Sequence, residues 1–143
     1  MWKKWADCRC AEGWGDAGLL ILRVAIGLIF LVHGWNKLTG MGVEGVTGML
    51  SSLGFPLAGF FAIVLLTVEI VGGTALILGL FTHWAAKLTA IVALVALVLV
   101  HLGKGFAVEG GGYEFVLLLL ASTVAVMTMG GGKYSLDHQM WRK

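Results

Sequence analysis

The chain has 143 residues, of which 59% are hydrophobic and only 13% are charged; its net charge is +2 and its mean hydropathy +0.93. A soluble domain of this size needs more polar surface to cover its core, so the composition indicates an integral membrane protein with one domain, residues 1–143. The small net charge and the lack of a basic run argue against nucleic acid as a partner.

The segment before the first apolar stretch carries Cys8 and Cys10 in a C-x-C pattern. Such a pair can bind a soft metal or exchange disulfides, but no second Cys/His pair stands nearby. The cytoplasmic side, where the charge pattern below places this segment, is a reducing compartment that disfavours a structural disulfide. We therefore expect no chemistry here, and metal binding by Cys8 and Cys10 is the weaker alternative.

Four apolar segments qualify as membrane spans, because a bilayer core of roughly 30 Å needs about 20 helical residues. They comprise residues 18–38, 57–80, 84–102 and 113–129, and the last is the shortest. Pro56 lies just before the second segment, where its missing N–H costs nothing. All six tryptophans lie outside the segments or at their ends, as in an aromatic belt. The sequence therefore predicts an all-α membrane bundle of four helices.

The connections between the segments differ in character. Between the first two spans, apolar residues recur at helical spacing, which predicts a short amphipathic helix on the membrane surface. These residues are Val43, Val46, Leu50 and Leu53. The link "FTH" between the second and third spans is tight, so those helices should be antiparallel neighbours. The glycine-rich link "GKGFAVEGGG" predicts a flexible loop.

Lysine and arginine are distributed unequally between the two sides of this bundle. The side that holds both termini carries Lys3, Lys4, Arg9, Lys87, Lys133, Arg142 and Lys143. The opposite side carries Lys37 and Lys104. Because positive charge accumulates on the cytoplasmic side of membrane proteins, both termini are predicted to be cytoplasmic.

Three ionisable residues lie in the inner half of the predicted spans, Arg23, Glu69 and Lys87, and the first two are the candidates for a pair. On insertion scales, placing such a group inside the membrane costs roughly 2.5–3.5 kcal/mol, so each is expected to have a partner or a function. The depths of Arg23 and Glu69 differ by roughly 8 Å, which a long arginine side chain and helix tilt could bridge. The sequence favours an Arg23–Glu69 ion pair that docks the first two spans, with close contact at Gly72 and Gly73. The alternative is that Glu69 handles a proton or binds a quinol.

A second polar set lies in the outer half. It consists of His33, Asn36, Lys37, His101 and Glu114. On the first span, His33 and Lys37 share one helical stripe with Arg23, so this stripe should face protein or a cavity rather than lipid. The set could line a pocket for a quinone head group, a metal or an anionic substrate. The alternative is an ordinary position at the water interface, which fits His33 least because it lies a turn deeper.

Three motifs in order resemble those of the DoxX family. They are "RVAIGLIFLVHGWNKL", "EIVGGTALILGLFTHWAA", and "YEFVLLLLA" followed by "GGGKYSLD", at residues 23–38, 69–86, 113–121 and 130–137. The match extends from Leu19 to Asp137, nearly the whole chain. The chain departs from the family pattern at two points. The last glycine-rich turn lacks the proline that is usual there, and His83 stands where arginine is frequent.

The resemblance implies a multi-pass protein of the prokaryotic inner membrane, tied to redox work at the quinone pool. We therefore expect a membrane redox component that interacts with quinone, with the lipid bilayer and other membrane or redox subunits as partners. The sequence offers no haem, flavin or iron–sulfur motif, so an accessory or quinone-site subunit without a covalently bound cofactor is favoured over a complete enzyme. Two alternatives stay open: a structural subunit of a larger respiratory or transport complex, and a small transporter.

Overall fold

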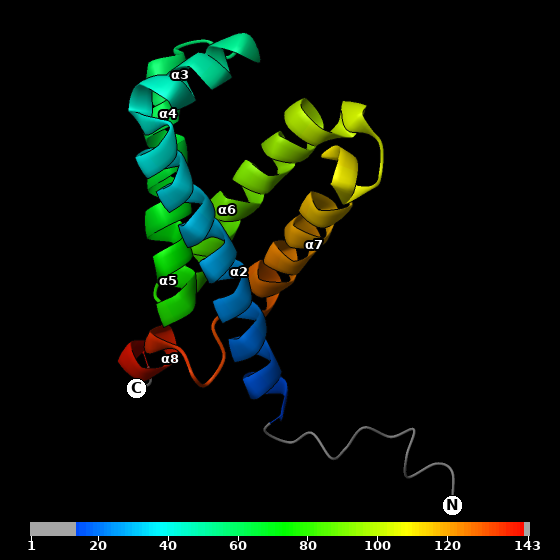
Figure 1. Cartoon of the computed structure of the whole chain (residues 1–143). Coiled ribbons are helices and arrows are strands. Elements are labelled where there is room, and N and C mark those ends of the chain that lie inside the picture. Colours follow the sequence, from blue (N-terminus) through cyan, green and yellow to red (C-terminus); the bar gives the residue numbers. More distant parts are fainter. Residues whose placement is uncertain (1–13, 142–143) are drawn as a thin grey trace, which may run out of the picture.

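The structure, a computed structural model, describes residues 14–141. Every regular secondary-structure element in this range is a helix (Figure 1). In chain order these are α2 (Trp14–Gly40), α3 (Gly42–Ser52), α4 (Ala58–Thr67), η2 (Val68–Gly72), α5 (Gly73–Leu78), α6 (Thr82–Ala96), η3 (Leu97–His101), η4 (Leu102–Lys104), η5 (Val108–Gly110), α7 (Glu114–Met129) and α8 (Leu136–Trp141). The predicted all-α fold class is thereby confirmed. Cys8 and Cys10 lie outside the described residues.

Three continuous rods are long and apolar enough to cross a membrane. The first is α2, with 27 residues; the second, Ala58–Leu78, joins α4, η2 and α5 into 21 residues; the third, Thr82–Lys104, joins α6, η3 and η4 into 23 residues. α7 is the shorter fourth apolar helix, with 16 residues. These elements agree with the four predicted spans, whereas the short α8 was not predicted.

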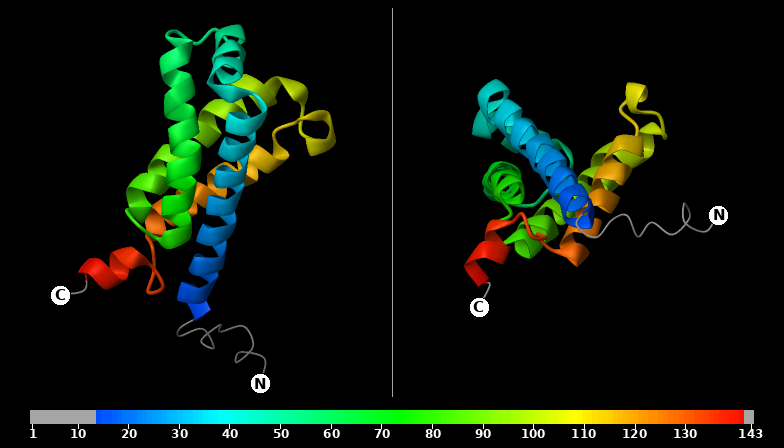
Figure 2. Two further views of the ribbon diagram at one scale, coloured as in Figure 1. Left: turned by 60° about the vertical axis from the view of Figure 1, so that its left-hand side comes forward. Right: turned by 90° about the horizontal axis from the view of Figure 1, so that it is seen from below.

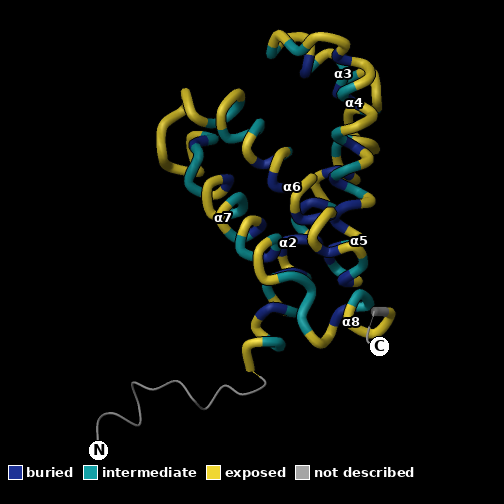
Figure 3. Tube along the Cα trace, turned by 180° about the vertical axis from the view of Figure 1, so that it is seen from behind, coloured by how far each residue is buried: buried dark blue, intermediate teal, exposed yellow. Residues whose placement is uncertain are grey.

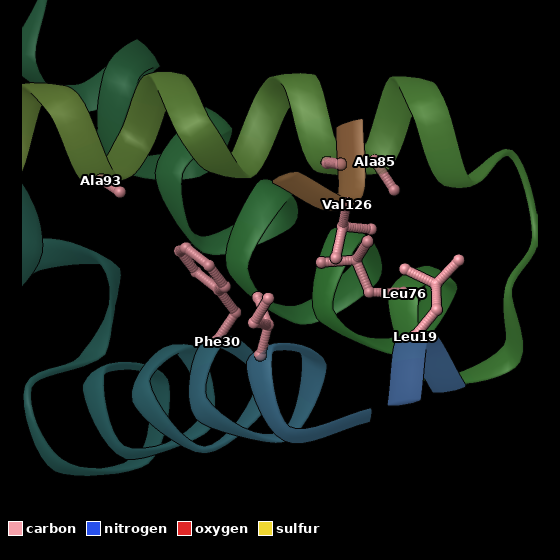
Figure 4. Close-up of a cluster of buried hydrophobic side chains, with 8 residues drawn as sticks. Leu19, Phe30, Leu76, Ala85, Ala93 and Val126 are labelled. Carbon is pink, nitrogen blue, oxygen red and sulfur yellow. The ribbon is translucent and has the colours of Figure 1, made fainter. Parts of the chain in front are cut away.

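The four long elements pack as two pairs. α2 lies along the α4–η2–α5 rod, and α6 lies along α7; the pairs meet near α8 and diverge toward the end that carries α3 (Figures 1 and 2). The buried residues are concentrated where α2, α5 and α6 meet (Figure 3). Their apolar cluster comprises Leu19, Ile26, Phe30, Leu76, Ala85, Ala86, Ala93 and Val126 (Figure 4). The three alanines belong to α6, and their small side chains allow this helix to approach α7 and the η2–α5 part of the second rod closely.

Glycines set the distance between α2 and the second rod. A Cβ atom added at Gly27 would lie 2.6 Å from the carbonyl oxygen of Gly73, and one added at Gly73 would lie 2.7 Å from the carbonyl oxygen of Gly27. The two backbones therefore touch directly at this point. The predicted close contact at Gly73 is confirmed, while Gly72 faces Thr89 of α6 instead.

The segment between the first two rods forms the predicted short helix, α3. Its buried residues Val46 and Leu50 pack on the start of α4, against Ala58 and Ala62. Val43, which belongs to the predicted apolar stripe, is exposed. The connection between α6 and α7 is more ordered than expected, because the N–H groups of residues 113 and 114 donate to the carbonyls of residues 105 and 106.

The glycine contact makes a testable prediction about stability. Gly27→Ala should lower the free energy of unfolding by about 1–3 kcal/mol, because the added methyl group overlaps the backbone of α5. Thermal unfolding in detergent micelles measures the effect. Gly18→Ala on the same helix is the matched control, because a Cβ there meets nothing within 4 Å. Equal melting temperatures for the two variants would contradict a backbone contact at Gly27.

Candidate functional site

Glu69 occupies an irregular turn in the middle of the second rod. Residues Val68–Gly72 form a π-helical turn, a wider turn that inserts one extra residue into the helix and is frequent at functional sites. The Glu69 side chain is only 5% exposed, although it lies in an apolar helix. Burial of a carboxylate costs free energy unless the group is paired, so Glu69 requires a partner.

That partner is Lys37 of α2. The Lys37 Nζ donates a hydrogen bond to the Glu69 Oε1 and forms an ion pair with it, and the lysine side chain is 24% exposed. Gly34, one turn before Lys37, permits the approach, because a Cβ there would lie 2.8 Å from the Glu69 Cβ. The pair therefore joins the first two rods and is open to the surroundings on its lysine side.

The second carboxylate oxygen of Glu69 lacks a partner of this kind. Oε2 is closed off from solvent and has no hydrogen-bond partner among the described residues. An unsatisfied buried acceptor costs about 1–3 kcal/mol, and more when the group is charged. A carboxylate with one free oxygen beside an ammonium group can accept a further hydrogen bond or a proton.

His33 lies one turn before Lys37 on the same side of α2. Its Nδ1 is 2.8 Å from the carbonyl oxygen of Ile29, and its side chain is exposed. A carbonyl oxygen only accepts, so Nδ1 must carry the hydrogen. In the neutral ring this leaves Nε2 as an acceptor.

The predicted ion pair between Arg23 and Glu69 is wrong. The fully buried Arg23 guanidinium instead donates to the carbonyl oxygens of Gly131 and Tyr134, at 2.8 and 2.9 Å. The reason is directional: helical side chains point back toward the N-terminus of their helix. Arg23 therefore extends away from Glu69, whereas Lys37 extends toward it.

The C-terminal segment that Arg23 binds is fixed by hydrogen bonds at two further points. The Asp137 carboxylate accepts hydrogen bonds from the backbone N–H groups of Phe81 and Thr82, both at 2.7 Å, where α6 begins. Asp16, near the start of α2, accepts one from the backbone N–H of Lys133 at 3.0 Å. The sequence "GGGKYSLD" thus folds back across the ends of α2 and α6. Arg23 has a structural role in this arrangement.

Among the residues that the structure describes, the remaining predicted outer-pocket residues form no hydrogen bond or ion pair with Lys37 or Glu69. Asn36 is exposed on α2. His101 ends η3, with its Nδ1 2.7 Å from the Gly111 carbonyl oxygen, and Glu114 begins α7, at the far end of the other helix pair. Within residues 14–141, no hydrogen bond or ion pair joins His101 or Glu114 to His33 or Lys37. In the same range, no three His, Cys, Asp or Glu side chains gather as metal ligands would.

The fold and the site together define a membrane protein of several apolar helices with a lysine–glutamate pair between the first two. The family model for DoxX matches residues 18–102, which include both residues of the pair. The chain belongs to the DoxX family.

Curated relatives agree with this assignment over most of their length. The chain is 35% identical to "Putative oxidoreductase CatD" of Bacillus subtilis, over 85% of this chain and 86% of that protein. It is 27% identical to "Inner membrane protein YqjF" of Escherichia coli, over 90% and 95%, and 31% identical to "Uncharacterized membrane protein Rv3486" of Mycobacterium tuberculosis, over 90% and 85%. No solved structure gives a significant match to the chain.

Arg23→Lys tests the anchoring of the C-terminal segment. A lysine cannot supply two donors in the fixed fork of a guanidinium, so one carbonyl should lose its partner, at a cost of about 1–3 kcal/mol. We expect a lower melting temperature and faster tryptic cleavage after Lys133. Glu109→Gln is the control, because Glu109 is exposed on η5, in the connection between α6 and α7. Equal protease resistance of Arg23→Lys and the wild type would contradict the anchoring role.

Proposed function

We propose that this protein is a membrane redox component that interacts with quinone through Lys37, Glu69 and His33. The observation that carries the proposal is the buried Lys37–Glu69 pair with its unpartnered carboxylate oxygen. Ionisable groups inside membrane helices are functional candidates by default, because they are expensive to keep there. Quinones dissolve in the bilayer and change protonation when they change redox state, so their head groups require nearby proton donors and acceptors.

The chemistry of the three side chains supports this class of ligand. The Lys37 ammonium has N–H donors beyond the one used for Glu69, and these suit a quinone carbonyl oxygen. The free Oε2 of Glu69 and the Nε2 of neutral His33 suit a hydroxyl group. Donor and acceptor thus belong to one ion pair, as a ligand that interconverts carbonyl and hydroxyl oxygens requires.

The relatives support the redox part of the proposal and the location. CatD carries the word oxidoreductase in its name, and YqjF is named as an inner membrane protein. We place this protein likewise in a prokaryotic inner membrane, as an accessory or quinone-site subunit that works with redox partner proteins. The partner supplies the electron carrier.

Quinone binding tests the proposal directly. A short-chain quinone added to the purified protein in detergent should bind at least about tenfold more weakly to Lys37→Met, because the charge-assisted hydrogen bond to the carbonyl is lost. Quenching of tryptophan fluorescence gives the dissociation constant.

Lys104→Met is the matched control, since Lys104 is exposed and lies at the end of η4. Binding that is unchanged in Lys37→Met, or absent from the wild type, would sink the proposal. A stable complex with partner subunits that keeps its activity in Lys37→Met would favour a purely structural subunit.

We propose further that both termini face the cytoplasm, which places Lys37 in the outer half of the membrane, with its side chain reaching back to Glu69 near the middle of the second rod. The start of α2 and α8 lie at one end of the bundle, opposite α3 (Figure 1). In a variant whose two native cysteines are replaced by serine, Glu109→Cys should react with a membrane-impermeant thiol reagent in spheroplasts. Lys133→Cys should react only after the membrane is permeabilised. The reverse pattern would invert the orientation.

A further inference from the structure

The region around Lys37 is rich in hydrogen-bond acceptors. Glu69 Oε2 is buried without a partner, and His33 presents Nε2 as an acceptor in its neutral form. Glu69 of η2 is paired with the Lys37 ammonium, and His33 lies one turn before Lys37 on α2. A ligand at this point therefore gains most if it brings hydrogen atoms to donate.

The two redox forms of a quinone differ in this respect. The oxidised form has carbonyl oxygens, which only accept, while the reduced hydroquinone has hydroxyl groups, which also donate. A carbonyl oxygen placed beside the free carboxylate oxygen would face another acceptor in a setting of low dielectric, where an unpaired polar group is costly. A hydroxyl group at the same point would satisfy that oxygen.

Oε2 itself is closed off from solvent, so we take a ligand to approach from the more exposed lysine side of the pair. The Lys37 side chain is 24% exposed, while that of Glu69 is 5% exposed. His33 is exposed one turn from Lys37 on α2, within the reach of a head group that spans one helical turn. The hydrogen bond from Nδ1 to the Ile29 carbonyl fixes which ring nitrogen is left to accept from it.

We infer that this site recognises the reduced hydroquinone in preference to the oxidised quinone, with Glu69 and His33 as acceptors for its hydroxyl groups. The inference rests on the proposed function and adds to it the redox form that binds. A site of this kind holds the hydroquinone in the membrane beside a partner protein, or reports the reduced fraction of the pool to that partner.

The test measures the dissociation constants of one short-chain hydroquinone and its matching quinone, under anaerobic conditions, on the full chain in detergent. The wild type should bind the hydroquinone at least about tenfold more tightly, since sites that hydrogen-bond a hydroxyl discriminate strongly against ligands that lack it. Glu69→Gln places an amide where the free oxygen was, and an amide NH₂ donates to a carbonyl. This variant should bring the ratio to about one or invert it.

Two further variants separate recognition from folding. His33→Leu changes an exposed position, and it should weaken hydroquinone binding while leaving quinone binding nearly unchanged. Glu109→Gln makes the same carboxylate-to-amide change on an exposed turn and should leave the ratio as in the wild type.

The outcomes distinguish the inference from the proposed function. Equal binding of both forms by the wild type, or tighter binding of the quinone, would overturn the preference and leave the quinone interaction intact. Binding of neither form would overturn both. If Glu69→Gln does not fold, the His33→Leu ratio decides, and a ratio unchanged from that of the wild type would remove His33 from the site.

Discussion

The direct backbone contact between α2 and the second rod is the constraint on which the rest of the structure depends. Gly27 and Gly73 leave no room for side chains between the two helices. Gly34 continues the same close approach toward the other end of α2, where it brings Lys37 within reach of Glu69. In a bilayer, where lipid is as apolar as leucine, such close packing and polar contacts replace the hydrophobic effect as the force that joins helices.

α2 carries two cations with opposite tasks. Arg23, near its beginning, is fully buried and binds backbone carbonyls, which are permanent features of the C-terminal segment. Lys37, near its end, is partly exposed and binds a titratable group that keeps one oxygen free. A guanidinium suits the first task because its donors form a rigid fork, and an ammonium suits the second because it can turn among several acceptors. The proposed quinone site uses only the second cation.

Hydropathy was sufficient to predict the spans and the helix between the first two, because both depend on composition and periodicity. The partners of the buried charges could not be predicted in that way. Depth along the helix made Arg23–Glu69 plausible, but depth ignores the direction of side chains and the carbonyls that a returning segment presents. Lys37, the actual partner of Glu69, lies on the same helical stripe as Arg23. The extra residue of the π turn at Glu69 has no recognised signal in a single sequence.

The short α7 has a consequence for the lipid around it. Its 16 residues extend about 24 Å at the helical rise, less than the roughly 30 Å hydrocarbon core of a typical bilayer. α7 is also oblique to α2 in the bundle, which shortens its reach if α2 stands upright (Figure 1). A helix shorter than the hydrocarbon core is accommodated by a thinner adjoining bilayer, by flanking side chains that reach the interface, or by oligomerisation. Where the bilayer thins to match α7, head groups and water approach the α6–α7 side of the molecule.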